Sequence, residues 1–513
     1  MLLKVQMLGI DSSGRPTVFL NKQDADDLGI TSSGRVQVSS KGAIVTAIVN
    51  ITSFVKKGSI IVSEEIHRRL ELKRKSTVDV DVAAFPKSLQ FIRNKLAGKK
   101  LLYDEVHEIV KDVVGGNLNE SEVAAFVTAL HIQGLDLDEA TNLASSMVQT
   151  GKRLDLDAKM IVDKHSVGGV PGDKTTLLVV PIVAAAGLVI PKTSSRAITS
   201  AGGTADRAEV LMPVDLNIKE MKNVIKKCNG CIVWGGSLDL APADDIFVKV
   251  EYSLSIDPLL LPSIMSKKKA VGTTHLVIDI PTGRGAKIKT IGEADLLAKD
   301  AIELGRRLGI KSHCLVTYGE QPLGLTMGPL LEAKEALEVL MNKSSIPDLV
   351  DKACHLAGAI FEMAGKKSGY GMAKEILQTG KAEKKLRGII SSQGGNPNIL
   401  PDDLAPGSHN LQIRAKNSGR VLWMDNNLLV SIARAAGAPK DKGAGIIFNK
   451  KRGNKVKKDE ILFTVYSEKS RKLSRVEEIL GLENPVGVGD RMEMVIHRIK
   501  EAPVVKRAFT LER

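Results

Sequence analysis

Hydrophobic and polar positions follow four different patterns along the chain. Residues 1–85 alternate with a period of two, as β-strands with one buried face do. Residues 86–159 follow a helical period, and we expect residues 241–272 to rejoin this helical domain. Residues 160–240 and 273–420 alternate strands with helices, and residues 421–513 return to short strands. These patterns predict a multidomain α/β protein with an N-terminal β domain, a helical domain, an α/β domain containing a mostly parallel sheet, and a C-terminal α+β domain.

The N-terminal region contains an internal repeat. Its hydrophobic positions recur 42 residues later, so that Leu28, Ile30, Val36 and Val38 correspond to Leu70, Leu72, Val78 and Val80. Each copy indicates a short helix, a turn and an alternating strand. A duplicated unit of this size resembles a double-psi β-barrel. Such barrels serve in assembly or substrate presentation, so we expect a homo-oligomer larger than a dimer, formed through this domain.

Two capping signatures mark helices in the second region. Asn119 with Glu122, and Asp136 with Glu139, have the spacing of capping boxes. In the α/β region, strands are predicted over residues 160–163, 188–193, 231–233, 276–280 and 311–317, with helices over 174–186 and 217–228. This alternation implies a parallel sheet, and such sheets bind ligands at the carboxyl ends of their strands.

A glycine-rich loop follows the first of these strands. Residues 164–176 read Lys-His-Ser-Val-Gly-Gly-Val-Pro-Gly-Asp-Lys-Thr-Thr. Three glycines let backbone N–H groups close on an anion, and the N-terminus of the next helix favours negative charge. Asp173 separates Gly172 from Lys174, so the loop is not a Walker loop. We expect an anion site here, and a tight turn without a ligand is the alternative.

The second strand leads into a similar loop. Residues 194–206 contain several hydroxyl side chains, Arg196 and the pair Gly202-Gly203. Two such loops after successive parallel strands are stronger evidence for a ligand site than either loop alone.

The composition indicates which sign of charge the ligand carries. The chain has 513 residues, and 73 Lys+Arg against 59 Asp+Glu give a net charge of +14, which favours an anionic partner. Aromatic residues make up only 3%, which argues against a stacking platform for single-stranded nucleic acid. Four cysteines are too few for a disulfide framework, and no apolar run reaches the ~20 residues of a membrane span. We therefore expect a cytoplasmic protein without nucleic-acid or membrane partners.

The two loops together resemble the signature of the thymidine phosphorylase family, the pyrimidine-type nucleoside phosphorylases. The matching residues are Lys164-His165-Ser166, Gly168-Gly169, Gly172-Asp173, Ser194, Arg196, Gly202-Gly203-Thr204, Asp206 and Glu209. Further ordered matches, such as Gly283-Arg284-Gly285-Ala286 and Gln321-Pro322-Leu323-Gly324, extend the similarity from about Pro86 to about Lys472. The resemblance implies a helical domain and an α/β domain separated by a cleft, related in fold to anthranilate phosphoribosyltransferase.

The resemblance also implies the chemistry. In the family, phosphate attacks the anomeric carbon of a nucleoside, the base departs, and a sugar 1-phosphate forms. By motif match, the attacking phosphate is held by Lys164, Ser166, Thr176, Ser194 and Thr204. The nucleophile must be held and oriented, and the departing base needs a proton. No organic cofactor and no metal are implied, since inorganic phosphate is a co-substrate.

Four departures from the family pattern resemble its archaeal branch, whose members cleave AMP with phosphate to adenine and ribose 1,5-bisphosphate. Pro171 is inserted in the first loop, Ser200 replaces a His, an N-terminal domain is added, and residues 248–252 replace the Arg-Asp-Val stretch that helps read a pyrimidine. The resemblance implies that Asp257 donates the proton to the base. It also implies AMP contacts at Gly169, Ser195, Arg196, Ala197, Ile198, Thr199, Ser200, Thr204, Ser263 and Lys287.

Some of these assignments have alternatives. Ser266 could take the place of Ser263, and Lys289 that of Lys287. Local sequence alone favours Asp257 as a helix-terminating residue before Pro258, and only the family match favours the proton donor. An Asp that donates a proton needs a raised pKa, which a closed apolar cleft provides.

Two phosphate groups in one cleft need several cations. The candidates are Arg196, Lys267, Arg284 and Lys287. The alternative within enzymes is a pyrimidine nucleoside phosphorylase acting on thymidine or uridine. The alternative outside enzymes is a nucleotide- or RNA-binding assembly protein, although we expect the basic run Lys450-Lys451-Arg452 to be a solvated β-turn.

Two further signals have structural explanations. Cys228 and Cys231 have the spacing of half a zinc site, but buried free cysteines explain them better. Glu332, Glu335 and Glu338 recur on one side of a predicted helix, which we expect to face water.

Overall fold

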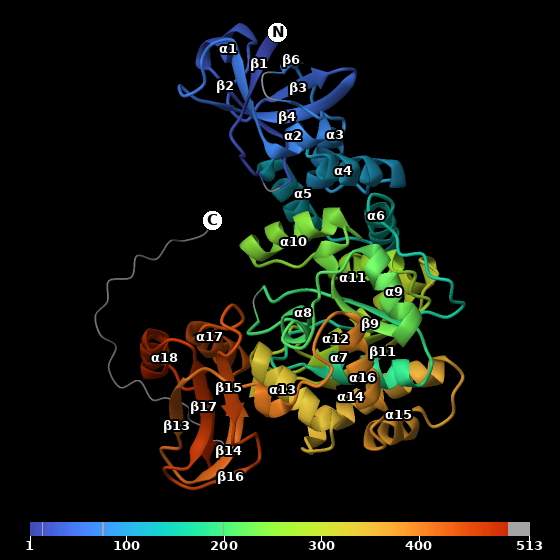
Figure 1. Ribbon diagram of the computed structural model, residues 1–513, viewed down its shortest axis with the longest axis vertical. Coiled ribbons are helices and arrows are strands. Elements are labelled where there is room, and N and C mark those ends of the chain that lie inside the picture. The colour runs from blue at the N-terminus through green and yellow to red at the C-terminus, as the bar shows by residue number, and fades with distance from the viewer. Residues whose placement is uncertain (13, 74–75, 199, 491–513) are drawn as a thin grey trace.

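The structure is a computed structural model that describes residues 1–12, 14–73, 76–198 and 200–490. The N-terminal barrel lies at one end of the molecule, helices follow beneath it, and the α/β region and the C-terminal strands form the other end (Figure 1). The multidomain α/β architecture expected from the sequence is confirmed. None of the described helices is long and apolar enough to cross a membrane.

The N-terminal region forms a closed barrel. Its strands are β1 (Leu2–Met7), β2 (Thr17–Leu20), β3 (Arg35–Ser40), β4 (Ala43–Ile51), β5 (Ser59–Val62) and β6 (Thr77–Val82), with helices α1 (Lys22–Asp27) and α2 (Glu64–Arg69). The strands pair in the order β1-β5-β2-β4-β3-β6. The repeated hydrophobic residues of the two halves share one core, and Leu28 packs at its margin. The duplicated pattern therefore correctly predicts the interior of the barrel.

The barrel is tied to the helical region by a buried arginine. Arg35 of β3 forms an ion pair with Glu122, and its Nε donates to the carbonyl oxygen of Asn117 at 2.8 Å. Glu122 also completes the capping box of Asn119, whose Oδ1 accepts from the Glu122 N–H at 3.0 Å. One carboxylate therefore both starts a helix and joins the two regions.

The helical region consists of α3 (Ser88–Leu96), α4 (Tyr103–Gly115), α5 (Glu120–Gln133) and α6 (Leu137–Gln149). Both predicted capping boxes are confirmed, since Asp136 Oδ1 also accepts from the Glu139 N–H at 2.9 Å. Helix α10 (Pro242–Leu254) packs into the same core, where Phe247 lies 5.8 Å from Phe126 between ring centroids.

The α/β region contains two sets of parallel strands. One sheet has the order β11-β10-β7 and the other pairs β8 with β9, over the ranges β7 (Val162–Ser166), β8 (Ile190–Ser194), β9 (Gly230–Trp234), β10 (His275–Thr282) and β11 (Lys311–Tyr318). An isolated parallel bridge between Ile161 and Val189 links them. The first predicted strand is wrong at its end: β7 continues to Ser166, because Ser166 pairs with Asp279 of β10.

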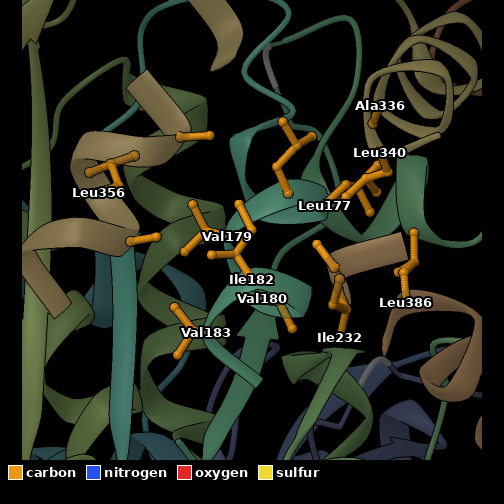
Figure 2. Packing of buried hydrophobic residues seen from close by; sticks show 14 of the residues in the cluster. Leu177, Val179, Val180, Ile182, Val183, Ile232, Ala336, Leu340, Leu356 and Leu386 are labelled. Carbon is orange, nitrogen blue, oxygen red and sulfur yellow. The ribbon is translucent and has the colours of Figure 1, made fainter. Parts of the chain in front are cut away.

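Helix α7 (Thr175–Ala185) forms the centre of this region. Nearly all of its side chains are buried, and α13 (Pro329–Leu340), α14 (Pro347–Met363) and α16 (Lys381–Ser392) pack around it. Figure 2 shows Leu177, Val180 and Val183 of α7 among residues of these neighbouring helices. The remaining helices are α8 (Thr204–Ala208), α9 (Ile218–Cys228), α11 (Leu260–Ala270), α12 (Ile291–Arg307) and α15 (Gly369–Gln378).

Two glutamates of α13 are buried, so the expectation that this side of the helix faces water is wrong. Glu335 forms an ion pair with Lys174, and Glu332 forms one with Arg207 at 2.9 Å. The side chain of Lys174 is 0% exposed and that of Glu335 is 4% exposed. Lys174 belongs to the first glycine-rich loop, and Arg207 lies on α8, the helix that follows the second loop. The two ion pairs therefore connect α13 to both loops.

The C-terminal region combines two antiparallel sheets with helices α17 (Asn426–Ala436) and α18 (Ser470–Leu482). One sheet has the order β12-β15-β17-β13, with β12 (Thr326–Met327), β13 (His409–Arg414), β15 (Gly445–Phe448) and β17 (Ile461–Ser467). The other has the order β16-β14-β18, with β14 (Gly419–Met424), β16 (Lys455–Val456) and β18 (Val486–Gly489). Residues 491–513 of the predicted C-terminal domain lie outside the described residues.

The basic run at residues 450–452 is only partly solvated, which corrects the expectation of a free basic turn. Lys451 is buried, and its ammonium donates to the carbonyl oxygen of Gly324 at 2.9 Å and to Asp348 at 2.8 Å. The cysteines are free, as expected, and Cys228, Cys231 and Cys354 are buried.

Candidate functional site

The glycine-rich loop between β7 and α7 adopts a conformation that its glycines require. Gly168, Gly169 and Gly172 all have positive φ angles. At Gly169, φ is +92°, and a Cβ atom would lie 2.4 Å from the backbone nitrogen of Lys287. Gly169 therefore permits the close approach of the segment that carries Lys287.

The loop between β8 and α8 is held by a buried carboxylate. Asp206 Oδ2 accepts from the backbone N–H of Ala197 at 2.7 Å and from that of Gly203 at 2.9 Å. Ser195 contributes its carbonyl oxygen, which accepts from Ala205 N–H at 3.2 Å. These bonds hold Ser195, Ala197 and Gly203 against the start of α8. Thr199 lies outside the described residues.

The residues predicted to hold phosphate come from these two loops and the strands before them. Lys164 and Ser166 lie on β7, Thr176 in the first turn of α7, Ser194 at the end of β8, and Thr204 at the start of α8. The parallel bridge between Ile161 and Val189 makes β7 and β8 neighbours. The five predicted phosphate ligands therefore lie on two adjacent parallel strands or in the helices that follow them. Ligands of open α/β sheets bind at the carboxyl ends of such strands.

Lys164 is enclosed. Its ammonium donates to the hydroxyl of Thr175 at 2.6 Å, and its side chain is 2% exposed. Burial lowers the pKa of Lys164, while the carboxylates of Asp173 and Asp279 act in the opposite direction. The ammonium of Lys352 lies 2.8 Å from the carboxylate of Asp279. Buried cations and carboxylates therefore lie close together at the base of the loop.

A cavity of about 540 Å³ opens beside these loops. Three of the predicted AMP contacts line it, namely Gly169, Ser200 and Lys287, together with the alternative residue Lys289. The other lining residues are Val170, Pro171, Tyr252, Gly285, Ala286, Asn427, Val430, Ser431 and Arg434. The cavity thus lies between the first loop, α10 and helix α17 of the C-terminal region.

Asp257 lies next to this cavity through its contact with Lys287. The ammonium of Lys287 donates to Asp257 Oδ2 at 2.7 Å, and the two side chains are 47% and 41% exposed. The expected apolar surrounding is therefore absent from this arrangement, in which Asp257 is half-exposed and beside a cation.

Two other candidate cations are already paired. Arg196 bonds to both carboxylate oxygens of Glu209, at 2.9 and 2.6 Å, and its guanidinium lies 5.0 Å from the ring centroid of Trp234. The bonds to Arg196 hold the pKa of Glu209 at about 2. Lys267 pairs with Asp244 at 2.5 Å.

Three further predicted residues are not among those that line the cavity. Ile198 and Arg284 are exposed, and Ser263 lies on α11. The alternative Ser266 is fully buried, and its hydroxyl donates to the carbonyl oxygen of Ser263 at 3.1 Å.

A buried carboxyl group supports the segment that carries Asp257. Glu251, near the end of α10, accepts from the backbone N–H of Leu259 at 3.0 Å. Burial raises the pKa of Glu251 to about 7, and the negative charge of Asp257 acts in the same direction. Sequence reasoning missed Glu251 as a supporting group, although it noted the segment as a departure from the pyrimidine-reading pattern.

Sequence reasoning also missed the cavity residues of α17. Asn427, Ser431 and Arg434 line the cavity, although they lie far along the chain from the two loops. Their spacing of three and four residues places them on one helix face. That spacing was the available signal, but nothing local indicated which cavity the face lines.

Comparisons with known proteins agree with this geometry. Residues 89–151 match the helical bundle domain of the glycosyl transferase family, residues 158–383 match its a/b domain, and residues 421–481 match the pyrimidine nucleoside phosphorylase C-terminal domain. The crystal structure of anthranilate phosphoribosyltransferase from Thermus thermophilus is similar in fold, with a TM-score of 0.50 and 20% identity over 59% of this chain and 99% of that one.

Three relatives of similar length are AMP phosphorylases. The AMP phosphorylase of Thermofilum pendens is 48% identical over 100% of both chains. That of Thermococcus kodakarensis is 46% identical over 97% of this chain and 99% of its own, and that of Methanococcoides burtonii is 46% identical over 98% and 100%. Full-length identity at this level means that the chain belongs to the AMP phosphorylase family, within the nucleoside phosphorylases.

Proposed function

We propose that the protein catalyses the phosphorolysis of AMP by inorganic phosphate, with release of adenine and ribose 1,5-bisphosphate. The observation that carries the proposal is the meeting of the Gly169 loop with Lys287 and its partner Asp257 at one cavity. The relatives that are similar over the full length are AMP phosphorylases, which supports the same substrate.

In the proposed reaction, a phosphate oxygen forms a bond to C1′ of the ribose while the bond from C1′ to the base nitrogen breaks. Lys164, Ser166, Thr176, Ser194 and Thr204 hold the phosphate, because they surround the carboxyl ends of β7 and β8. Asp257 gives its proton to a ring nitrogen of the departing adenine, so that the base leaves neutral. The AMP contacts are those that the family match assigns, with Lys287 in the cavity wall.

Asp257 must carry a proton at the moment of base departure. In the structure its carboxyl group lies 2.7 Å from the ammonium of Lys287. The nucleotide is itself an anion and competes with Asp257 for the ammonium of Lys287. We infer that AMP binding draws Lys287 toward the phosphate and away from Asp257.

The substrate panel that tests this proposal contains AMP, CMP, UMP, adenosine, uridine and thymidine. Each is incubated with the protein with and without phosphate, and free base is separated by chromatography. We expect phosphate-dependent release of adenine from AMP. Turnover of uridine or thymidine that equals or exceeds that of AMP would contradict the nucleotide assignment.

We further propose that the protein forms a homo-oligomer larger than a dimer through its barrel, and that it works in the cytoplasm. Ile44 and Phe54 support the first part, since these barrel side chains are 61% and 75% exposed. Light scattering after size exclusion should give a lower mass for a chain that begins at residue 86, and for the double variant Ile44→Ser/Phe54→Ser. An unchanged mass in both cases would contradict the proposed interface.

A further inference from the structure

Helix α17 of the C-terminal region forms one wall of the cavity, and Arg434 is the cation on that wall. Its Nη1 donates to the carbonyl oxygen of Ile198 at 2.8 Å and to that of Ser200 at 3.3 Å. The guanidinium therefore lies against the loop that follows β8. This contact spans more than 230 residues of sequence and joins the C-terminal region to the substrate loop.

Three other candidate cations form ion pairs with protein carboxylates. Lys287 pairs with Asp257, Arg196 with Glu209, and Lys267 with Asp244. Each pairing reduces the field that the cation offers to a bound anion.

Arg434 differs from these cations in its partners. Among the described residues, its hydrogen-bond partners are the two backbone carbonyl groups, and none is a carboxylate. Lys289, which also lines the cavity, likewise donates to a carbonyl, that of Ala286 at 2.6 Å. Arg434 and Lys289 therefore bring positive charge to the cavity wall that no described carboxylate cancels.

We propose that Arg434 binds the 5′-phosphate of the substrate and makes the enzyme select nucleoside 5′-monophosphates over nucleosides. This inference rests on the proposed function. A guanidinium has five N–H donors in a planar fork, and toward the described residues of the loop only Nη1 donates. The remaining donors match two phosphate oxygens, which a nucleoside lacks.

The test compares AMP with adenosine in the wild-type enzyme and in Arg434→Gln. A charge-assisted contact of this kind corresponds to roughly 10- to 100-fold in affinity. We expect KM for AMP to rise by that factor in Arg434→Gln, while kcat/KM for adenosine changes by less than about threefold. Arg434→Lys keeps the charge without the fork, and we expect a smaller rise in KM.

The matched control is Arg420→Gln. Arg420 is an exposed arginine of β14 in the same region, and its Nη1 also donates to a backbone carbonyl, that of Gly453 at 3.0 Å. We expect this variant to keep the wild-type KM for AMP. Equal losses for AMP and adenosine in Arg434→Gln would overturn the proposal, because they would mean that Arg434 only shapes the loop.

Binding measurements separate this inference from the proposed reaction. If the wild-type protein releases no adenine from AMP, calorimetry with AMP and with ribose 5-phosphate still tests Arg434. Binding to the wild type that weakens at least roughly 10-fold in Arg434→Gln would support the phosphate contact while the reaction fails. Equal binding by both proteins, or no binding by the wild type, would overturn it. If Arg434→Gln does not fold, Arg434→Lys serves for the same measurements.

Discussion

The ammonium of Lys287 lies 2.7 Å from the carboxylate of Asp257 and on the wall of the cavity. The residue assigned as proton donor and a cation suited to an anionic substrate therefore share one contact. The contact holds Asp257 in place, and an anion that binds Lys287 competes with Asp257 for its ammonium.

Asp257→Asn removes the proposed proton donor while keeping the side chain nearly isosteric. General acid catalysis contributes about 100- to 10,000-fold, so we expect kcat for AMP phosphorolysis to fall by a factor in that range. Because Asp257 is not a phosphate ligand in this account, the Kd for AMP should change by less than about fivefold or should decrease, since Lys287 is released. Steady-state kinetics and calorimetry measure the two quantities, and wild-type kcat in the variant would contradict the assignment.

Gly169→Ala and Gly168→Ala form a matched pair in the first loop. Both positions have positive φ, which costs a residue with a side chain about 1–2 kcal/mol. At Gly168 a Cβ would meet nothing within 4 Å, whereas at Gly169 it would press on the backbone of Lys287 at 2.4 Å. We expect kcat/KM for AMP to fall at least roughly 10-fold further in Gly169→Ala, because the Lys287 segment must move. Equal kcat/KM values of the two variants would mean that the close approach of Gly169 to the Lys287 backbone is not needed for activity.

Glu251 should make stability depend on pH. Its folded-state pKa is about 7, against an ordinary value of 4.5. Between these values the unfolded chain loses the proton while the folded protein keeps it, so stability falls as pH rises through this window. Glu251→Gln lacks this dependence and still accepts the Leu259 N–H. We expect the variant to gain about 2 kcal/mol of unfolding free energy relative to wild type between pH 5 and pH 8.

Denaturant titrations of both proteins at the two pH values measure this difference. The change in unfolding free energy of wild type between the two pH values is compared with the same change in Glu251→Gln. Contributions from other titrating groups are the same in both proteins and cancel. A constant offset between wild type and Glu251→Gln would mean that Glu251 titrates normally.

The buried pair of Lys174 and Glu335 supports the first loop from α13. Lys174 also donates to the carbonyl oxygens of Leu323 and Thr326, at 3.1 and 2.9 Å. Glu335→Gln leaves the buried ammonium without its countercharge, which costs about 3–5 kcal/mol of unfolding free energy. The control Glu338→Gln changes a partly exposed glutamate of the same helix and should stay within about 0.5 kcal/mol of wild type. Similar small losses in both variants would contradict the importance of the pair.

Local signals in the sequence predicted the local structure well. The repeat at Val36 and Val78 predicted the core of the barrel, and the boxes at Asn119 and Asp136 predicted the starts of two helices. Capping boxes and alternating patterns act over a few residues, so the sequence contains them in full.

Long-range partners account for what the sequence did not reveal. Strand β7 extends to Ser166 because β10 pairs with it, and Glu335 is buried because Lys174 lies opposite, 161 positions away. The helical period correctly places Glu335 and Glu332 on a shared side of α13, but it contains no information about what that side meets. Arg434 is a similar case, since only the fold brings α17 to the cavity.

Phosphorolysis and hydrolysis of AMP are distinguished by following the phosphorus atoms of the reaction. AMP and inorganic phosphate are mixed with the protein, and ³¹P NMR and chromatography record all products. We expect each AMP consumed to give one adenine and one ribose 1,5-bisphosphate, with loss of one inorganic phosphate. Adenine release with ribose 5-phosphate and no consumption of phosphate would mean hydrolysis, and it would contradict the proposed phosphorolysis.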